Sequence, residues 1–364
     1  MKYIFLVPDG MADYPVPELD GKTPLEVAKI PNMHYFAKNG KVGLVRNVPD
    51  KMEPASDVAN LSLLGYDPRK YYSGRAPLEA ANMGVKLEEN EVAFRCNLIT
   101  EDFGSLADYS AGHISSNESK ILIETLNEKL GGGGIKFFPG VGYRHLVVIK
   151  SDQGLKGLSA RCIPPHNIVG EKITDQLPSG PGEDVLRKLI TDSKAVLEDH
   201  EINRIRLDLS ENPANMIWLW GQGVTPALEN FSEKWGVSGS IISAVDLIKG
   251  LGRLIGLTVI DVPGATGYVD TDYEAKARYA LESLEDKDFV FVHVEAPDEA
   301  GHEGNVKLKI SAIEAFDYHV VGAVRKYCEE NRNTKIVISP DHATPIVKRT
   351  HTSDYVPFIM FGKN

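Results

Sequence analysis

Acidic residues and histidines recur directly after short apolar stretches of this chain. One such pair, Asp298 and His302, stands four residues apart after the strand-like stretch Asp288 to Val294, which Pro297 ends. If the chain turns helical after this stretch, the i,i+4 spacing places the carboxylate and the imidazole on one helix face, as two ligands of one metal ion require. The alternative for this pair alone is an acidic helix start with a surface histidine.

Two other apolar stretches end in the same way. One, at the N-terminus, is followed by Asp9, and another, near the C-terminus, is followed by Asp341 and His342; His351 lies in a loop just before a last apolar stretch. A single aspartate after a strand is more often a turn or helix-capping residue than a ligand. The repetition of the pattern, with histidines nearby, favours a metal site over that alternative.

Ser56 is the candidate nucleophile. It stands with Asp57 at the start of an apolar helix expected over residues 58–64, which Gly65 ends. A serine in this position is often only a helix cap. Beside a cluster of acids and histidines, however, its hydroxyl could bind a divalent ion, lose its proton and become a nucleophile.

These candidates are too many ligands for one ion and suit two; they are Asp9, Ser56, Asp298, His302, Asp341, His342 and His351. Mixed carboxylate and imidazole ligands favour Mn²⁺, Zn²⁺ or Co²⁺ over Ca²⁺ or Mg²⁺. Paired ions can clamp the attacking and leaving oxygens of a phosphoryl transfer. The chemistry indicated is therefore phosphoryl transfer through a phosphoserine intermediate.

The elements that must position these residues alternate between strands and helices, which predicts an α/β fold with its site at the strand ends. Between about residues 80 and 210 the acid and histidine pairs disappear. We expect an inserted, smaller α/β domain there, with a capped helix starting at Ser115 and a β-hairpin turning at Pro139 and Gly140. Polar residues 201–215 are expected to form a linker back. The predicted core is 1–80 with 210–364, and the insert is 81–209.

Composition narrows the class of protein. With 364 residues, 42% of them hydrophobic, and a net charge of −11, we expect a soluble globular protein and neither a nucleic-acid nor an anionic-membrane partner. Three cysteines without CxxC spacing fit a reducing cytoplasm. The first apolar stretch is too short for a signal peptide, and no stretch approaches membrane-spanning length. No P-loop or GxGxxG motif supports nucleotide binding.

The sequence around the candidate residues resembles a known family. The motifs are PDGMAD, PASDVANLSLLGYDP, VEAPDEAGHEG, SPDHAT and RTHTSDYVPF. In this order, and over nearly the whole chain, they look like the alkaline phosphatase superfamily, specifically the shorter lineage of 2,3-bisphosphoglycerate-independent phosphoglycerate mutases. The resemblance implies an alkaline-phosphatase-like sheet core with helices on both faces and a substrate-gripping insert after the serine helix. It also implies one ion on Asp298, His302 and His351, and another on Asp9, Ser56, Asp341 and His342.

By this resemblance the protein would interconvert 3-phosphoglycerate and 2-phosphoglycerate in glycolysis and gluconeogenesis. It would need two divalent ions, Mn²⁺ being favoured, and no 2,3-bisphosphoglycerate. A metal-dependent phosphohydrolase and an ATP-using kinase are alternatives on the same site, and a metal-binding protein without activity is a remote one. The insert argues against a plain hydrolase, because a lid would protect a phosphoserine from water.

Within the insert, Arg144 resembles a family arginine that grips the substrate's phosphate or carboxylate, a task that suits a guanidinium group. His113 and Arg75 are further candidates, although each alone could be a surface arginine or a core-facing histidine. The tripeptide ending in His113, AGH, departs from the pattern of many mutases of the shorter lineage, which have an arginine there. It is similar to a subgroup proposed as homoserine kinases, so the resemblance leaves homoserine open as a substrate.

Overall fold

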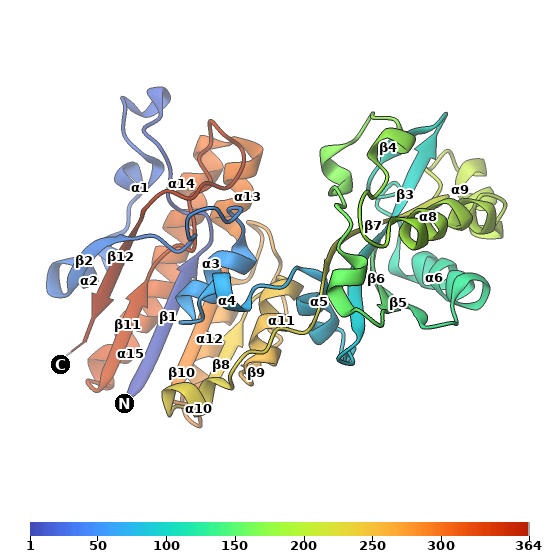
Figure 1. The fold of residues 1–364 in the computed structure, drawn as a ribbon. Helices are drawn as coiled ribbons and strands as arrows, with labels where there is room; N and C mark the ends of the chain where they lie inside the picture. Colours follow the sequence, from blue (N-terminus) through green and yellow to red (C-terminus); the bar gives the residue numbers. More distant parts are fainter. Residues whose placement is uncertain (363–364) are drawn as a thin grey trace. The chain divides into compact units, whose positions relative to one another are not determined.

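The computed structural model describes residues 1–362 and divides into two compact units (Figure 1). Unit 1 comprises Met1–Tyr72 and Ala227–Asn364, and unit 2 comprises Ser73–Pro226. Unit 2 extends beyond the expected insert, residues 81–209, at both ends. None of the helices in the described part of the chain is both long and apolar enough to cross a membrane.

Unit 1 is built on one seven-stranded sheet in the order β2-β12-β11-β1-β10-β8-β9 (Figure 1). Its strands are β1 (Lys2–Pro8), β2 (Lys41–Val45), β8 (Gly239–Ile242), β9 (Thr258–Val259), β10 (Phe289–Val294), β11 (Thr334–Ile338) and β12 (Val356–Phe361). The central strand β1 pairs in parallel with β10 on one side and β11 on the other. Their carboxyl ends therefore meet at one edge of the sheet.

Helices cover both faces of this sheet, as continuous apolar strands require. The helices of unit 1 are α1 (Pro24–Val27), α2 (Pro31–Asn39), α3 (Ser56–Leu63), α4 (Pro68–Tyr71), α10 (Phe231–Trp235), α11 (Asp246–Leu254), α12 (Tyr273–Ser283), α13 (Ala296–Glu303), α14 (Val306–Ala315) and α15 (Gly322–Glu330), with a 3-10 turn η1 (Pro17–Leu19) and a π-helical turn η4 (Phe316–Val321). On one face, Ile4 and Leu6 of β1 and Val292 of β10 pack with Phe36 and Phe316 in a single buried core.

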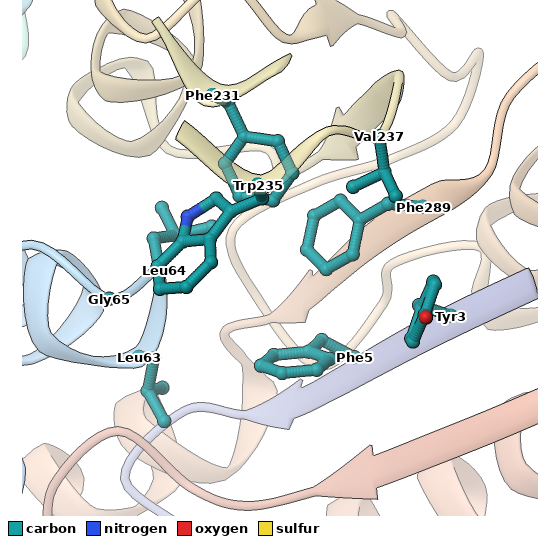
Figure 2. A pocket seen from close by; sticks show the side chains of 9 residues that line it. All are labelled: Tyr3, Phe5, Leu63, Leu64, Gly65, Phe231, Trp235, Val237 and Phe289. Atoms are coloured by element: carbon teal, nitrogen blue, oxygen red, sulfur yellow. The ribbon is translucent and has the colours of Figure 1, made fainter. Parts of the chain in front are cut away.

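The opposite face of β1 and β10 carries aromatic side chains. Tyr3, Phe5 and Phe289 line an apolar pocket of about 340 Å³ together with residues from the end of α3 and from α10 (Figure 2). Gly65, which follows α3, has a φ of +81°, and a Cβ there would lie 2.5 Å from the ring of Trp235. Glycine is therefore required where α3 ends. The pocket lies near the starts of the strands, whereas the predicted acids follow their ends.

Unit 2 contains a five-stranded antiparallel sheet in the order β4-β3-β6-β5, with β7 paired to β3. Its elements are α5 (Ala76–Asn82), β3 (Glu91–Asp102), β4 (Ser105–Asp108), α6 (Ser116–Leu130), β5 (Ile135–Val141), β6 (Arg144–Lys150), η2 (Gly154–Leu158), η3 (Pro165–Asn167), α7 (Ile173–Gln176), α8 (Glu183–Leu197), α9 (Glu201–Asp208) and β7 (Met216–Gly223). Leu122 and Leu126 of α6 and Leu186 and Ile190 of α8 pack on the sheet in one core.

Two local expectations for unit 2 were wrong. The hairpin between β5 and β6 does not turn at Pro139 and Gly140, because the register of β5 shifts between Phe138 and Val141 and the strand continues past these residues. The segment expected as a polar linker contains the helix α9, whose Arg206 is buried. Arg206 is accommodated there because its guanidinium group bonds to Glu118 and to the carbonyl of Ala111.

Candidate active site

The residues predicted after β10 lie on the short helix α13. The Oδ2 atom of Asp298 lies 3.1 Å from Nε2 of His302, one turn later on the same helix face. His351, from the loop before β12, places its Nε2 3.0 Å from Nε2 of His302 and 3.5 Å from Oδ1 of Asp298. These three side chains thus form one cluster of possible ligands.

The outer nitrogens of both histidines face backbone carbonyls. Nδ1 of His302 lies 3.0 Å from the carbonyl oxygen of Arg349, and Nδ1 of His351 lies 3.3 Å from that of Pro54. If each Nδ1–H donates to its carbonyl, both Nε2 lone pairs are directed inward, as in metal-binding imidazoles. Two lone pairs 3.0 Å apart require a cation or a proton beside them. The donor set therefore suits a divalent ion.

A second cluster lies where β1 and β11 end side by side. Nε2 of His342 lies 3.5 Å from Oδ1 of Asp9 and 3.4 Å from Oδ2 of Asp341. Asn60 on α3 donates to Oδ2 of Asp341, and the backbone amide of Gly10 donates to Oδ1. The Oδ1 atom of Asp9 is buried and has no hydrogen-bond partner among the described residues. A buried, unpaired carboxylate oxygen is most simply accounted for by a bound cation.

Ser56 is the first residue of α3 and does not cap it. The N-cap position is Ala55, and no side chain makes a capping hydrogen bond there. The Oγ atom of Ser56 instead lies 3.1 Å from Nε2 of His342. The structure therefore contradicts the helix-cap alternative. The start of α3, where the helix dipole is positive, favours negative charge beside this hydroxyl.

The acids of the two clusters have strongly shifted pKa values. Burial, and then the charges of Asp341 and Asp298, raise the pKa of Asp9 well above its usual range. Burial acts in the same direction on Asp298, but hydrogen bonds with His302 and His351 hold its pKa well below the usual range. The hydrogen bond with Asp298 raises the pKa of His302 to about 9. Three carboxylates buried this close together require positive charge, which divalent ions would supply.

A buried ion pair that the sequence analysis missed fixes the loops after β1 and β11. Nζ of Lys309 lies 2.8 Å from Oδ2 of Asp13, and both side chains are fully buried. The same Nζ donates to the carbonyl of Thr344, and Asp13 accepts from the backbone amide of Ile346. One lysine on α14 thereby holds together the loops that carry the acids of the second cluster.

The sequence analysis also missed a second buried group, which lies next to Asp9 and consists of His293, Glu295 and Lys276. Nε2 of His293 lies 3.2 Å from Oδ2 of Asp9, and Nζ of Lys276 lies 2.7 Å from Oε2 of Glu295. Burial lowers the pKa of His293, but the negative charges of Asp9 and Glu295 outweigh this effect and raise the pKa to about 10. The sequence did offer one signal for this group, because a histidine inside the apolar stretch that forms the fully buried strand β10 needs polar partners.

In unit 2 the structure brings together two of the three predicted substrate-binding residues. Arg75 precedes α5 and Arg144 begins β6. Burial lowers the pKa of Arg95, and the charges of Arg75 and Arg144 lower it further. Arg95, which the sequence analysis missed, lies 3.1 Å from Glu79 and 4.2 Å from the ring of Trp220. His113 lies exposed in the loop between β4 and α6 with a φ of +52°. The arginines thus make a cationic cluster on unit 2.

An α/β sheet whose central strands end in buried carboxylates and imidazoles, next to a serine at a helix start, defines a class of metal-dependent phosphoryl-transfer enzymes. The model of the family 2,3-bisphosphoglycerate-independent phosphoglycerate mutase matches residues 37–203. An enzyme of that name from Methanosarcina acetivorans is 53% identical over 362 residues, 99% of this chain and 90% of the relative. One from Methanothermobacter thermautotrophicus is 54% identical over 100% of this chain and 89% of its own length. The chain belongs to the 2,3-bisphosphoglycerate-independent phosphoglycerate mutase family.

Solved structures agree with this assignment. A Pyrococcus horikoshii protein matches with a TM-score of 0.81 and 30% identity, over 99% of this chain and 87% of that one. A cofactor-independent phosphoglycerate mutase from Thermoplasma acidophilum matches with a TM-score of 0.64 and 28% identity, over 100% and 90%. The predicted family, the predicted α/β fold and the prediction of an enzyme are confirmed.

Proposed function

We propose that this protein interconverts 3-phosphoglycerate and 2-phosphoglycerate by passing the phosphoryl group to Ser56 and back, without 2,3-bisphosphoglycerate. The observation that carries the proposal is the position of the Ser56 hydroxyl. It has no capping role, lies 3.1 Å from His342, and stands at a helix start beside two clusters of possible metal ligands. The family membership supports the same reaction.

Two divalent ions would be held by the residues of the two clusters. Asp298, His302 and His351 would hold one ion; Asp9, Ser56, Asp341 and His342 would hold the other. Such ions, when bound, neutralise the charge of the transferring phosphoryl group and lower the pKa of a coordinated hydroxyl. The mixture of carboxylate and imidazole favours Mn²⁺, with Zn²⁺ and Co²⁺ as alternatives.

The transfer of the phosphoryl group to Ser56 and its return need no reactant besides the phosphoglycerate. Oγ of Ser56 forms a bond to phosphorus as the bond to the 3-oxygen of glycerate breaks, and that oxygen takes up the equivalent of the proton that serine lost. Glycerate then turns. Its 2-hydroxyl oxygen attacks the phosphoserine, loses its proton, and returns Oγ to the hydroxyl form. The start of α3 favours the negative charge that develops beside Oγ in both steps.

The cationic cluster of unit 2 supports a role in holding the small phosphorylated substrate. Arg144 is exposed and Arg75 is partly exposed, so both guanidinium groups can reach a ligand, whereas the side chain of Arg95 is only 11% exposed and is paired with Glu79. Guanidinium groups bind carboxylates and phosphates in bidentate fashion. His113, exposed on the same unit, is a further candidate for contact with the substrate. The three free cysteines support the proposal of a reducing, cytoplasmic location.

Replacing Arg144 with glutamine should raise the KM for 3-phosphoglycerate by about 10- to 100-fold, the effect of losing one hydrogen bond between charged groups. Stability should change little, because the side chain is exposed. Steady-state kinetics and thermal melting check both statements. Arg204→Gln, an equal charge change on the exposed face of α9, is the control. An unchanged KM in the Arg144 variant would remove this residue from the proposed substrate site.

The substrate is best tested on one metal-loaded preparation with three assays. We expect turnover of 3-phosphoglycerate, coupled through enolase, without ATP and without 2,3-bisphosphoglycerate. We expect no ATP-dependent formation of phosphohomoserine, and release of inorganic phosphate at less than about 1% of the mutase rate, since water must be excluded from the phosphoserine. Homoserine phosphorylation without mutase turnover would replace the proposed function with a kinase, and dominant phosphate release would replace it with a hydrolase.

A further inference from the structure

His293 is completely buried between two carboxylates, and the reaction described above gives it no task. It occupies β10 between Val292 and Val294, with 0% of its side chain exposed. Its Nε2 atom lies 3.2 Å from Oδ2 of Asp9, and its Nδ1 atom lies 3.2 Å from Oε1 of Glu295. Burying a polar ring among valines costs free energy unless both nitrogens are engaged.

The contact between His293 and Asp9 does not have the geometry of a hydrogen bond. Among the described residues, Nε2 of His293 has no hydrogen-bond partner, and neither has Oδ1 of Asp9. Both atoms are shielded from water. The donor atoms of Asp9, His293 and Asp341 all lie within 4.8 Å of one another. Unpaired, buried nitrogen and oxygen atoms that converge in this way are the arrangement expected around a metal ion.

The other side of the imidazole is held in the manner of a metal-binding histidine. Oε1 of Glu295 faces Nδ1 and also accepts from Oγ of Ser243 and from the backbone amide of Ala244. Its second oxygen is paired with Nζ of Lys276 at 2.7 Å, and that lysine is fully buried. If Nδ1–H donates to the fixed carboxylate, the lone pair of Nε2 is directed at Asp9. Carboxylates behind ligating histidines commonly fix the tautomer and the ring orientation in this way.

We propose that His293 binds, through Nε2, the divalent ion held by Asp9 and Asp341, and that Glu295 and Lys276 are positioning residues for this ligand. The inference rests on the metal dependence in the proposed function and adds a nitrogen ligand to it. Asp341 follows β11, Asp9 follows β1 and His293 lies on β10, so each of the three neighbouring strands contributes one ligand. A nitrogen ligand favours Co²⁺, Zn²⁺ or Mn²⁺ over Mg²⁺ at this position.

The test is the binding of Co²⁺ to the metal-stripped full chain, without substrate. Competition with a chelator gives the affinity for each ion, and the visible absorption of Co²⁺ reports its nitrogen ligands. In the His293→Asn variant, one ion should bind at least about 100-fold more weakly, with a changed Co²⁺ spectrum, because a direct ligand is lost and even outer contacts cost 10- to 100-fold. The affinity for the other ion should stay within about 2-fold. The matched control is His34→Asn, because His34 is an exposed histidine of unit 1.

Glu295→Gln provides a second variant if His293→Asn fails to fold. It leaves the imidazole in place and should weaken the same ion by about 10- to 100-fold. Unchanged Co²⁺ affinity and spectrum in a folded variant would overturn the inference. Nitrogen NMR of the metal-loaded wild type would also overturn the inference if it found His293 protonated on both ring nitrogens. Because the readout is Co²⁺ binding, the two proposals fail separately: a wild-type chain that binds two ions but turns over no phosphoglycerate contradicts only the proposed function.

Discussion

Replacing Ser56 with alanine is expected to lower kcat for the interconversion of phosphoglycerates by at least about four orders of magnitude, the usual scale for loss of a catalytic nucleophile. The reason is that an alanine side chain has no oxygen to accept the phosphoryl group, whereas the other proposed ligands remain in place. Stability should be nearly unchanged, because the Ser56 side chain does not cap α3. The coupled enolase assay measures the loss, and mass spectrometry of substrate-treated wild type should locate a phosphate on Ser56.

Ser62→Ala is the matched control for this prediction. Ser62 lies on the same helix, and its hydroxyl bonds to the carbonyl of Val58 in that helix at 3.4 Å. The control should keep activity within about 3-fold, since such a change on a helix costs little. A Ser56 variant that stays active, or a phosphate trapped on another residue, would show that Ser56 is not the nucleophile.

Removal of divalent ions by a chelator is expected to reduce activity to background, and added Mn²⁺ is expected to restore it. Burial, and then the charges of Asp341 and Asp298, raise the pKa of Asp9, and the ions would supply the compensating charge. The melting temperature should also fall on chelation, because the ions bind only the folded site.

Metal analysis beside the activity measurement decides this prediction. We expect about two ions per chain in the active protein, and recovery of activity that follows ion content on readdition of Mn²⁺, Co²⁺ or Zn²⁺. Addition of Ca²⁺, whose preference is for oxygen ligands, serves as the control and should restore little. Full activity in a preparation that holds fewer than about one ion per chain would contradict the two-ion site.

Local pattern was enough to select the acids and histidines that the structure brings together in the candidate site. Asp9, Asp298 and Asp341 each follow an apolar strand, and neighbouring parallel strands of one sheet bring such ends together. The role of His293 could not be predicted, because its contact with Asp9 depends on the pairing of β1 with β10, where Val7 lies opposite His293. Sequence periodicity does not encode a partner so distant along the chain.

The same limit accounts for the errors in unit 2. In the polar helix α9, the buried Arg206 is paired with Glu118, which lies 88 residues earlier in the chain, so the burial of Arg206 cannot be read from its sequence neighbours. Arg95 lies within the long strand β3, where an arginine gives no sign that Glu79 and Trp220 will surround it. The sheet to which β7 belongs is likewise decided by its pairing with β3.

The central position of β1 has a consequence for how the chain is made. This strand leaves the ribosome before the other strands of its sheet, yet its partners β10 and β11 begin at residues 289 and 334. All strand pairs of unit 2, in contrast, can form once β7 has emerged at residue 223. Pairing so distant in sequence is slow and leaves unpaired strand edges in the meantime. We therefore expect the nascent protein to carry a formed insert and an exposed apolar strand β1 until β10 and β11 have been made, a state in which chaperones would have a surface to bind.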